Sequence, residues 1–424
     1  MSAGPLAGVR VIELASVESS FAGKLMADLG ADVILVEPPD QPPADSEGNA
    51  DADHVPPATL KRWHYHTSKR GVTLEWSLPS GKSLLRQLIG GADVLLERKW
   101  RWGLDAKGLG YAVLSRDNPR LIMVSITPFG QNDPRSNETV TDLTILAGGG
   151  PVWMNGYDDH SLPPVRGGGN QGYHTACHFA VMSTLVALLA RERTGRGQHI
   201  DVNMHACANV TTESGSYTWL GMRETVQRQT GRHASVHGTQ PTQIRCADGR
   251  YVVSGVPPRT AAQFRSVLDW LRELNLAEQF DQTPILELAI EETGGLKLDR
   301  VASDESIRAK LGAGREALNF IAERTPAMEF FTGAQRRGFQ VSIVYSPEEA
   351  FEDPHLKARG FQVEVEHPEL GKTFRYPGAP IRFTKTPWQI RRRAPLLGED
   401  NAEVFAELGL TESDLARLRG EGVL

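Results

Sequence analysis

The first forty residues place the strongest constraint on the fold. The run GVRVIELA (8–15) is rich in β-branched residues and is typical of a short strand. SFAGKLMADLGA (20–31) carries apolar residues at helical spacing, and DVILVE (32–37) indicates a second, buried strand. A strand, a helix and a strand within about thirty residues form a βαβ unit, whose strands are parallel. The sequence therefore predicts an α/β chain with a Rossmann-like, doubly wound sheet.

The same alternation continues through the first half of the chain. Further helices are expected at 80–91 and 172–193, and further strands at 92–97, 120–127 and 197–204. Gly195 supplies a stop signal after the second of these helices. The stretch 38–58 is rich in Pro, Asp and Ala, and we expect an exposed loop or lid there.

The character of the sequence changes after residue 225. TQIRCADGRYVVSG (242–255) contains two short strand patterns around Asp248-Gly249, a strong hairpin signal. We predict a large Rossmann-like domain in residues 1–225, a smaller α+β domain in 226–337 and a return to the large domain in 338–424. Later helices are expected at 259–273, 305–323, 326–337, 400–408 and 411–420, and strands at 338–346 and within 361–383.

The loop of the first βαβ unit argues against a dinucleotide site. It reads SVESS (16–20) and contains no glycine, whereas a pyrophosphate site needs a glycine-rich turn that lets the backbone approach the phosphates. Glu37 ends the second strand where a ribose-binding acid would stand, which alone is a weak signal. The sheet is therefore interpreted as a scaffold for a different site.

Composition narrows the possible partners and location. The formal net charge is −6, so nothing attracts the whole chain to nucleic acid or to an anionic membrane. Cys177, Cys207 and Cys246 form no CxxC pair, which argues against a zinc ribbon or a disulfide framework. The N-terminus does not resemble a secretory signal, and the apolar run 176–190 is too short for a membrane span. We expect a cytoplasmic protein.

Two local segments combine basic and aromatic residues. KRWHYHTSKR (61–70) and RKWRWG (98–103) suit a phosphorylated, base-bearing ligand, because cations bind phosphate and aromatic planes stack on a base. The second segment follows a predicted strand, and open α/β sheets bind ligands at the ends of their strands. The alternative is that both segments are solvated charged loops.

His174, His178 and Cys177 lie close together on the long predicted helix. An HxxxH pair can bind zinc, but a third ligand and a nearby acid are missing, so two hydrogen-bonded histidines are expected instead of a metal site. Cys177 is expected to be a buried structural thiol, since a nucleophilic thiol needs a lowered pKa.

Four segments resemble the class III CoA-transferase family (CaiB/BaiF type), which includes formyl-CoA transferase, carnitine CoA-transferase and α-methylacyl-CoA racemase. They are the opening PLAGVRVIELASVESSFAGKLMADLGADVILVEPP, the SKRGVTLEWSLPSGKSLLRQLIGGADVLLE block, ARERTGRGQHIDVNM (190–204) and RRRAPLLGEDNAEVFAELGL (391–410). The resemblance implies a Rossmann-like large domain, a smaller middle domain and an interlocked homodimer that binds an acyl-CoA and a carboxylic acid.

The resemblance also implies where coenzyme A would bind. The positions are Val17, Glu18, Lys69, Arg70, Leu74, Arg98, Lys99, Trp100, Lys107, Phe129 and Gly130. The chain departs from the family at some of them. Arg98-Lys99 stands where the family has Asn-Phe, and Pro38 stands where an arginine is common.

The family transferases use an aspartate nucleophile near the start of the long helix, and this chain lacks it. The aspartate attacks the thioester and passes through a mixed anhydride and an aspartyl-CoA thioester. Counting eighteen residues back from Arg191 places Tyr173 at its position, and 166–180 contains no Asp or Glu. The nearest acids upstream are Asp158 and Asp159, in a loop that by analogy lies near the acyl pocket or is simply solvated. The racemase histidine is replaced too, since Thr141 precedes Asp142, for which a structural role is equally open.

Three functions therefore stand at this stage. The chain is a CoA-transferase, or a related racemase, isomerase, lyase or hydrolase, with altered catalytic groups such as Tyr173, His174 and Asn170. In this reading the backbone of Gly167-Gly168-Gly169 forms either an oxyanion site or a plain turn. Alternatively it is a non-catalytic subunit of a heteromeric CoA-transferase, whose partner carries the aspartate. The third alternative is a CoA-binding regulatory protein.

Overall fold

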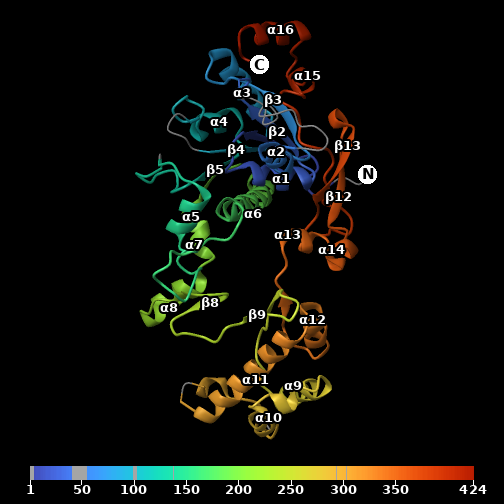
Figure 1. Ribbon diagram of the computed structural model, residues 1–424. Coiled ribbons are helices and arrows are strands. Elements are labelled where there is room, and N and C mark those ends of the chain that lie inside the picture. The colour runs from blue at the N-terminus through green and yellow to red at the C-terminus, as the bar shows by residue number, and fades with distance from the viewer. Residues whose placement is uncertain (1–3, 41–54, 99–102, 137, 293, 302) are drawn as a thin grey trace. The chain divides into compact units, whose positions relative to one another are not determined.

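The computed structural model describes residues 4–40, 55–98, 103–136, 138–292, 294–301 and 303–424 (Figure 1). The chain divides into two compact units. The large unit comprises Met1–Val152, Arg166–Ser216 and Phe351–Leu424, and the small unit Trp153–Val165 and Tyr217–Ala350. Most of the loop expected at 38–58 lies outside the described residues.

A six-stranded parallel sheet in the order β3-β2-β1-β4-β5-β6 forms the centre of the large unit. Its strands are β1 (Arg10–Leu14), β2 (Asp32–Glu37), β3 (Arg70–Thr73), β4 (Val94–Glu97), β5 (Ile122–Thr127) and β6 (His199–Asn203). The direction of strand order reverses between β1 and β4, which is where sheets of this kind bind ligands. The predicted doubly wound sheet is confirmed.

Alternate residues of each strand supply two separate cores, one on each face of the sheet. Val11 belongs to the core that includes α1 and α6, whereas its neighbour Ile12 belongs to the core that includes α3, α15 and α16. The large-unit helices are α1 (Ser20–Asp28), α2 (Pro57–Tyr65), α3 (Pro79–Gly90), α4 (Tyr111–Asp117), α5 (Asp142–Gly149), α6 (Gln171–Thr194), α7 (Met204–Val210), α14 (Pro354–Arg359), α15 (Asn401–Ala406) and α16 (Glu412–Gly420). Helix α8 (Glu213–Met222) and helix α13 (Pro347–Phe351) cross from one unit to the other in sequence.

Helix α6 is the one helix in the described part of the chain that is long and apolar enough to cross a membrane by length and composition. One side of it, which includes Tyr173, Ala176, Cys177 and Ala180, is buried in the core of the large unit. The expected buried helix is therefore present, and it extends beyond the 176–190 run at both ends.

The basic and aromatic segment 61–70 is not a solvated loop. Residues 61–65 form the last part of α2, and residues 66–70 lead from α2 into β3. The side chains of Trp63, Tyr65 and Lys69 are buried. The sequence pattern indicated a surface because it is rich in charge, but the charges meet partners inside the fold. Arg62 donates to both carboxylate oxygens of Glu37 at 2.5 and 2.8 Å, so Glu37 ends β2 as an ion-pair partner.

A fully buried ion pair joins this segment to the central strand. The Lys69 ammonium lies 2.7 Å from the Glu13 carboxylate, and neither side chain has exposed surface. Lys69 also donates to the Ser20 carbonyl at 3.0 Å and lies 3.0 Å from Nδ1 of His66. Burial raises the pKa of Glu13 to about 7 against the opposing effect of Lys69. Helix α1 crosses directly above at Gly23, where a Cβ would stand 1.7 Å from a Glu13 oxygen.

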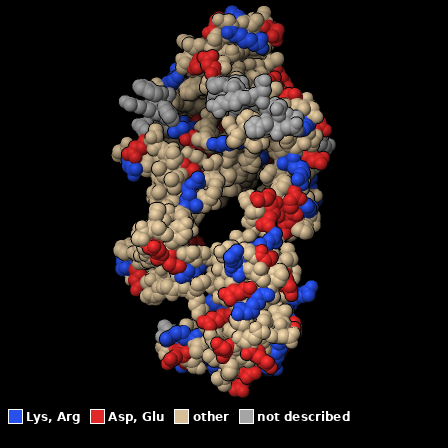
Figure 2. All heavy atoms as spheres, in the orientation of Figure 1, with Lys and Arg blue, Asp and Glu red and all other residues tan. Residues whose placement is uncertain are grey.

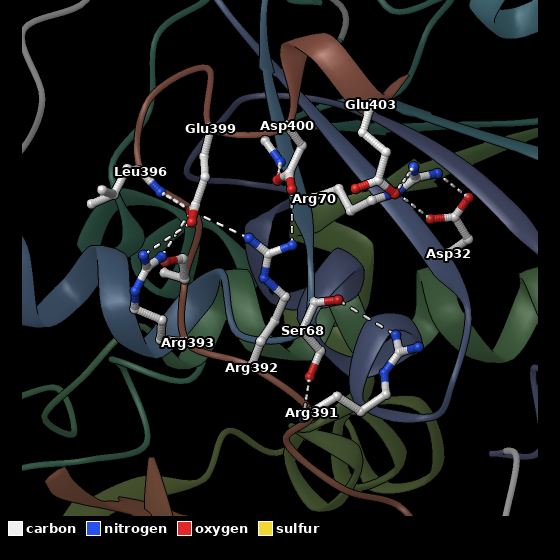
Figure 3. A network of polar contacts seen from close by, with 12 residues as sticks. Asp32, Ser68, Arg70, Arg391, Arg392, Arg393, Leu396, Glu399, Asp400 and Glu403 are labelled. Atoms are coloured by element: carbon white, nitrogen blue, oxygen red, sulfur yellow. Dashed lines mark hydrogen bonds and ion pairs between the residues drawn. The ribbon is translucent and has the colours of Figure 1, made fainter. Parts of the chain in front are cut away.

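Arg391 and Arg392 tie the C-terminal segment to the same region (Figure 3). Arg391 donates to the Ala27 and Ala31 carbonyls at 2.9 and 2.7 Å, and its own N–H donates to Ser68 Oγ. Arg392 pairs with Asp400, whose other oxygen accepts from the Gly71 N–H at 2.7 Å. The segment resembling the family's C-terminal signature is thus an internal clamp on β3. A hairpin of β12 (Gln362–His367) and β13 (Lys372–Pro377) precedes it, as predicted.

The small unit contains a three-stranded antiparallel sheet and four main helices. The sheet has β9 (Gln243–Arg245), β10 (Tyr251–Val253) and β11 (Ser342–Ile343), and the hairpin predicted at Asp248-Gly249 joins the first two. The helices are α9 (Ala261–Glu273), α10 (Thr283–Ile290), α11 (Glu305–Arg324) and α12 (Ala327–Arg336). A separate antiparallel pair is formed by β7 (Gln227–Gln229) and β8 (Arg232–Ser235).

The compact units do not follow the predicted boundaries at 225 and 337. The excursion 153–165 belongs to the small unit, and that unit continues to Ala350 because β11 pairs with β10. Within the stretch 338–346, where a strand was expected, β11 is only two residues long. The sequence of so short a strand does not indicate which sheet it joins.

Replacement of Lys69 by Met is expected to destabilise the chain by roughly 3–5 kcal/mol at pH 8, because it leaves Glu13 buried without its cation. The deficit should shrink at pH 5. A carboxyl with a raised folded-state pKa favours folding below its unfolded pKa, and that contribution is lost as the pH rises through the folded value. Urea unfolding of the wild type and of Lys69→Met at pH 8 and at pH 5 measures this difference in the free energy of unfolding.

The matched control is Lys61→Met, the same change at an exposed position of α2, which should alter stability by less than about 0.5 kcal/mol. A double variant, Glu13→Gln with Lys69→Met, should recover part of the loss. Equal stability of Lys69→Met and the wild type at pH 8 would contradict this account of the pair.

Candidate active site

A cavity of about 380 Å³ opens at the carboxyl ends of the central strands, beside the reversal between β1 and β4. Open α/β sheets place their ligand sites at this edge, because the loops that follow neighbouring strands splay apart there. The cavity is lined by Leu14, Ala15, Ser16, Val36, Pro38, Trp76, Glu97, Arg98, Gly103, Leu104 and Lys107.

The wall of this cavity carries cations and an aromatic plane. Arg98 follows β4, and Lys107 lies with its ammonium 4.5 Å from the centroid of the Trp76 ring. Arg98 and Lys107 were predicted from the sequence as CoA contacts, and the structure brings them to one cavity. Trp76 was missed, since it stands alone beyond β3 in a stretch without other aromatic residues.

Glu18 lies next to the cavity wall. One of its carboxylate oxygens is 2.9 Å from an Arg98 guanidinium nitrogen, and the side chain is 2% exposed. The other oxygen, Oε2, is buried and has no hydrogen-bond partner in the described part of the chain. Val17 beside it is exposed. The loop after β1 therefore presents one predicted position to solvent and buries the next.

The N-terminus of α6 is capped by a carboxylate from a different helix. Asp142 Oδ1 accepts from the N–H groups of Gly172 and Tyr173 at 2.8 and 3.2 Å, and Oδ2 accepts from Arg166 at 3.2 Å. The structure thus gives Asp142 the structural role, since it satisfies N–H groups that a helix start otherwise leaves open. Arg166 also donates to the carbonyls of Gly167 and Gly169, and Gly169 has φ +79°, so the chain bends at the glycines before it enters α6.

Tyr65 connects two of the residues that the sequence suggested for catalysis. Its hydroxyl lies 2.8 Å from Nε2 of His174 and accepts from Nδ2 of Asn170 at 3.0 Å. Phe21 of α1 stacks on the His174 ring with centroids 4.1 Å apart. Asn170 therefore points its amide at Tyr65 instead of capping α6. Tyr65 was visible in the sequence only as one aromatic residue of the segment 61–70.

Burial controls the ionisation of the groups along α6. It raises the pKa of Tyr173, with the charge of Glu18 adding to the effect, and lowers the pKa of His174. Burial also raises the pKa of Cys177 to about 12, and its thiol donates to the Glu18 carbonyl at 3.0 Å. Tyr173 and Cys177 are therefore neutral and poorly nucleophilic near pH 7. The buried structural thiol expected for Cys177 is observed.

Of the predicted CoA contacts that the structure describes, only Arg98 and Lys107 line this cavity. Lys69 and Leu74 are fully buried, the first in its ion pair and the second in the core. Arg70 is the first residue of β3 and lies at the amino ends of the strands, opposite to the cavity. There it pairs with Asp32 (Figure 3) and with Glu407, each at 2.6 Å. Lys99 and Trp100 lie outside the described residues.

Phe129 and Gly130 occupy the loop after β5. Phe129 stacks on His205 with centroids 4.3 Å apart, and the Gly130 N–H donates to Thr127. Gln131 next to them lines a second cavity of about 340 Å³, together with Asp105, Tyr111, Ala112, Asn132, His199 and Asp201.

The remaining sequence candidates have local roles. Asp158 pairs with Arg232 at 2.8 Å within the small unit, and Asp159 accepts from the N–H of Ser161. Across the described residues, no group of three or more His, Cys, Asp or Glu side chains is placed to hold a metal ion. On the face shown in Figure 2, basic and acidic side chains are interspersed, so a site for a polyanion has to be local.

Comparison with known sequences decides the family. The pattern of CoA-transferase family III matches residues 6–401, which is nearly the whole chain. This chain belongs to CoA-transferase family III. It is therefore a CoA-transferase that moves CoA between carboxylic acids, and the resemblance found from the sequence is confirmed.

The relatives of this family III chain match it from end to end. It is 30% identical to succinyl-CoA:(R)-benzylsuccinate CoA-transferase subunit BbsE of Thauera aromatica, over 98% of this chain and 97% of the relative. It is also 30% identical to succinyl-CoA–D-citramalate CoA-transferase of Chloroflexus aurantiacus, over 99% and 98% of the two chains. The crystal structure of a CaiB/BaiF family protein from Brucella suis covers 96% of this chain at 26% identity with a TM-score of 0.73, and this chain covers all of it.

Replacement of Asp142 by Ala in this family III chain is expected to cost about 1–3 kcal/mol of stability, because two N–H groups and Arg166 lose their acceptor. Hydrogen exchange should report the loss locally, as faster exchange of the Gly172 and Tyr173 amides. Asp159→Ala, which removes an exposed acid, serves as the control. Unchanged protection of the two amides in Asp142→Ala would show that the cap does not stabilise α6.

Proposed function

We propose that this family III chain takes CoA from succinyl-CoA and passes it to a second dicarboxylic acid, with the thioester bound in the cavity between the ends of β1 and β4. The cavity carries the proposal. Its position is the usual ligand site of such sheets, and its volume lies in the range of small-molecule pockets. Its lining combines two cations with an aromatic plane, which suits the phosphates and the base of CoA.

The choice of succinyl-CoA is supported by the relatives. Both full-length relatives at 30% identity are named for succinyl-CoA as one substrate and for a carboxylic acid as the other. A succinyl group ends in a carboxylate, and the guanidinium of Arg98 on the cavity wall offers such a group a charge-assisted partner. The acceptor acid is the part of the reaction that the relatives vary.

A second function is favoured by one feature of the sequence. Residues 166–180 contain no Asp or Glu, so the start of α6 lacks the carboxylate of the family transferases. Two relatives are named as subunits. In this alternative the chain binds CoA but completes the transfer only with a related partner chain that brings the carboxylate. Turnover by the purified chain alone separates the two functions.

Lys107→Ala and Trp76→Ala are each expected to weaken CoA binding by roughly tenfold to a hundredfold, since each removes a contact worth about 1.5–3 kcal/mol. Calorimetric titration with free CoA measures the change without depending on turnover. Lys297→Ala, at an exposed position of the small unit, is the matched control. Unaltered CoA affinity in both cavity variants would place the CoA site elsewhere.

The purified chain is expected to convert succinyl-CoA and an added dicarboxylic acid into succinate and a new acyl-CoA. Chromatography with mass detection of the thioesters, across a panel of acceptor acids, identifies the product. Monocarboxylic acids of similar length test whether the second carboxylate matters. Formation of a new thioester only after a related partner chain is added would favour the subunit alternative.

A further inference from the structure

Glu18 carries a buried carboxylate that is only partly satisfied among the residues that the structure describes. Its side chain is 2% exposed, and Arg98 contacts one oxygen while Oε2 has no hydrogen-bond partner in the described part of the chain. Burying half of a carboxylate without a donor costs free energy that folding alone does not require. A buried polar atom without a partner calls for an explanation, and a role in binding or chemistry is one such explanation.

The position of Glu18 fits a role in chemistry. It lies in the loop after the central strand β1, two residues beyond Ser16 of the cavity lining. The same loop is fixed at both ends, because Ser16 Oγ accepts from the Ser19 N–H at 3.2 Å and Cys177 Sγ donates to the Glu18 carbonyl. The main chain of Glu18 is therefore anchored to α6, and its carboxylate meets Arg98 of the cavity wall.

Other nucleophilic side chains near this point are already engaged, and Glu97 of the cavity lining accepts from the Ser125 hydroxyl. Asp142 uses both oxygens, Oδ1 on two helix N–H groups and Oδ2 on Arg166. Cys177 is a buried neutral thiol that donates to a carbonyl. The Tyr173 phenol is 7% exposed and neutral near pH 7. Glu13 also lies close, but it is sealed beneath α1 in its pair with Lys69.

We propose that Glu18 is the carboxylate nucleophile of this chain, in place of the aspartate that is missing at the start of α6. This inference rests on the proposed CoA-transferase activity of the chain alone. Arg98 holds the carboxylate in the resting enzyme and also lines the cavity. An anionic acyl group in the cavity offers the Arg98 guanidinium a second partner. When Arg98 pairs with that group, the Glu18 carboxylate is released from its ion pair.

The transfer then balances without any further reactant. The Glu18 carboxylate attacks the thioester carbonyl, the C–S bond breaks, and CoA thiolate leaves from a mixed anhydride. The thiolate attacks the glutamyl carbonyl, which releases the first acid as its carboxylate and leaves a glutamyl-CoA thioester. The acceptor carboxylate attacks that thioester, CoA thiolate leaves again, and its attack on the acceptor's carbonyl yields the new acyl-CoA and restores Glu18.

The test traps the covalent intermediate on the full-length chain. Wild type, Glu18→Gln and Glu364→Gln are incubated with succinyl-CoA, quenched with hydroxylamine and digested with trypsin. Hydroxylamine converts a glutamyl thioester or anhydride into a hydroxamate. Cleavage after Arg10 and Lys24 isolates Glu18 on peptide 11–24, and fragmentation separates it from Glu13. Glu364 is exposed on β12 and controls for the same chemical change far from the cavity lining.

The expected result is a hydroxamate at Glu18 in the wild type and in Glu364→Gln. Glu18→Gln should show none and should lose turnover by about a thousandfold or more, as expected when a nucleophile is removed. Its affinity for CoA should stay within about threefold of the wild type, because the cavity cations remain. Thermal unfolding of each variant checks that it is folded, and the wild-type adduct decides the assignment even if Glu18→Gln does not fold.

Two different failures are distinguishable. Turnover by the wild type with the hydroxamate on a different Asp or Glu, or with full activity in Glu18→Gln, would overturn the role of Glu18 and leave the proposed function intact. CoA binding without turnover and without any adduct in the wild type would overturn both, and would favour the subunit alternative.

Discussion

The buried ion pair between Lys69 and Glu13 is the contact on which the large unit depends. It joins the middle of the central strand to the connection between α2 and β3, across 56 residues of sequence, and α1 passes above it only because residue 23 is glycine. The next layer builds on it. Ser68 adopts φ +63°, unusual for a residue with a side chain, and is held there by Asp28 and by the backbone of Arg391. The C-terminal clamp therefore closes on a loop that the ion pair has already fixed.

The two edges of the sheet use arginine in opposite ways. At the amino ends of the strands, Arg70 pairs with Asp32 and Glu403 (Figure 3) and also with Glu407. Its charge is therefore neutralised by other side chains of the large unit. At the carboxyl edge, Arg98 pairs with one half of Glu18 and also faces a cavity. The same residue type thus stabilises the scaffold at one edge and remains available to an anionic ligand at the other.

Periodicity in the sequence predicted the scaffold well. The runs at 8–15, 32–37 and 120–127 became strands of one parallel sheet because β-branched and apolar residues continue without interruption, as parallel strands buried on both faces require. The hairpin at Asp248-Gly249 followed from turn chemistry that is local to a few residues. Each of these signals lies within a short stretch of chain, so no knowledge of distant partners was needed.

The roles of individual charged residues were less predictable, because they depend on partners far away in the chain. Lys69 and Arg70 are neighbours in a basic segment, yet one faces Glu13 inside the fold and the other faces Glu407 at the sheet edge. Tyr65 gained its importance only when α2 brought it to His174 and Asn170, more than a hundred residues later. Glu18 was expected near CoA, but its unsatisfied oxygen could be seen only once its surroundings were known.

The central claim is that CoA lies in the cavity beside β1 and β4 with its sulfur close to Glu18. A crystal structure of the chain with CoA bound measures this most directly. We predict that the CoA phosphates contact Arg98 or Lys107, and that the thiol sulfur approaches the Glu18 carboxylate within about 4 Å, the range of van der Waals contact between reacting groups. CoA bound with its sulfur away from Glu18, or outside this cavity altogether, would contradict the account.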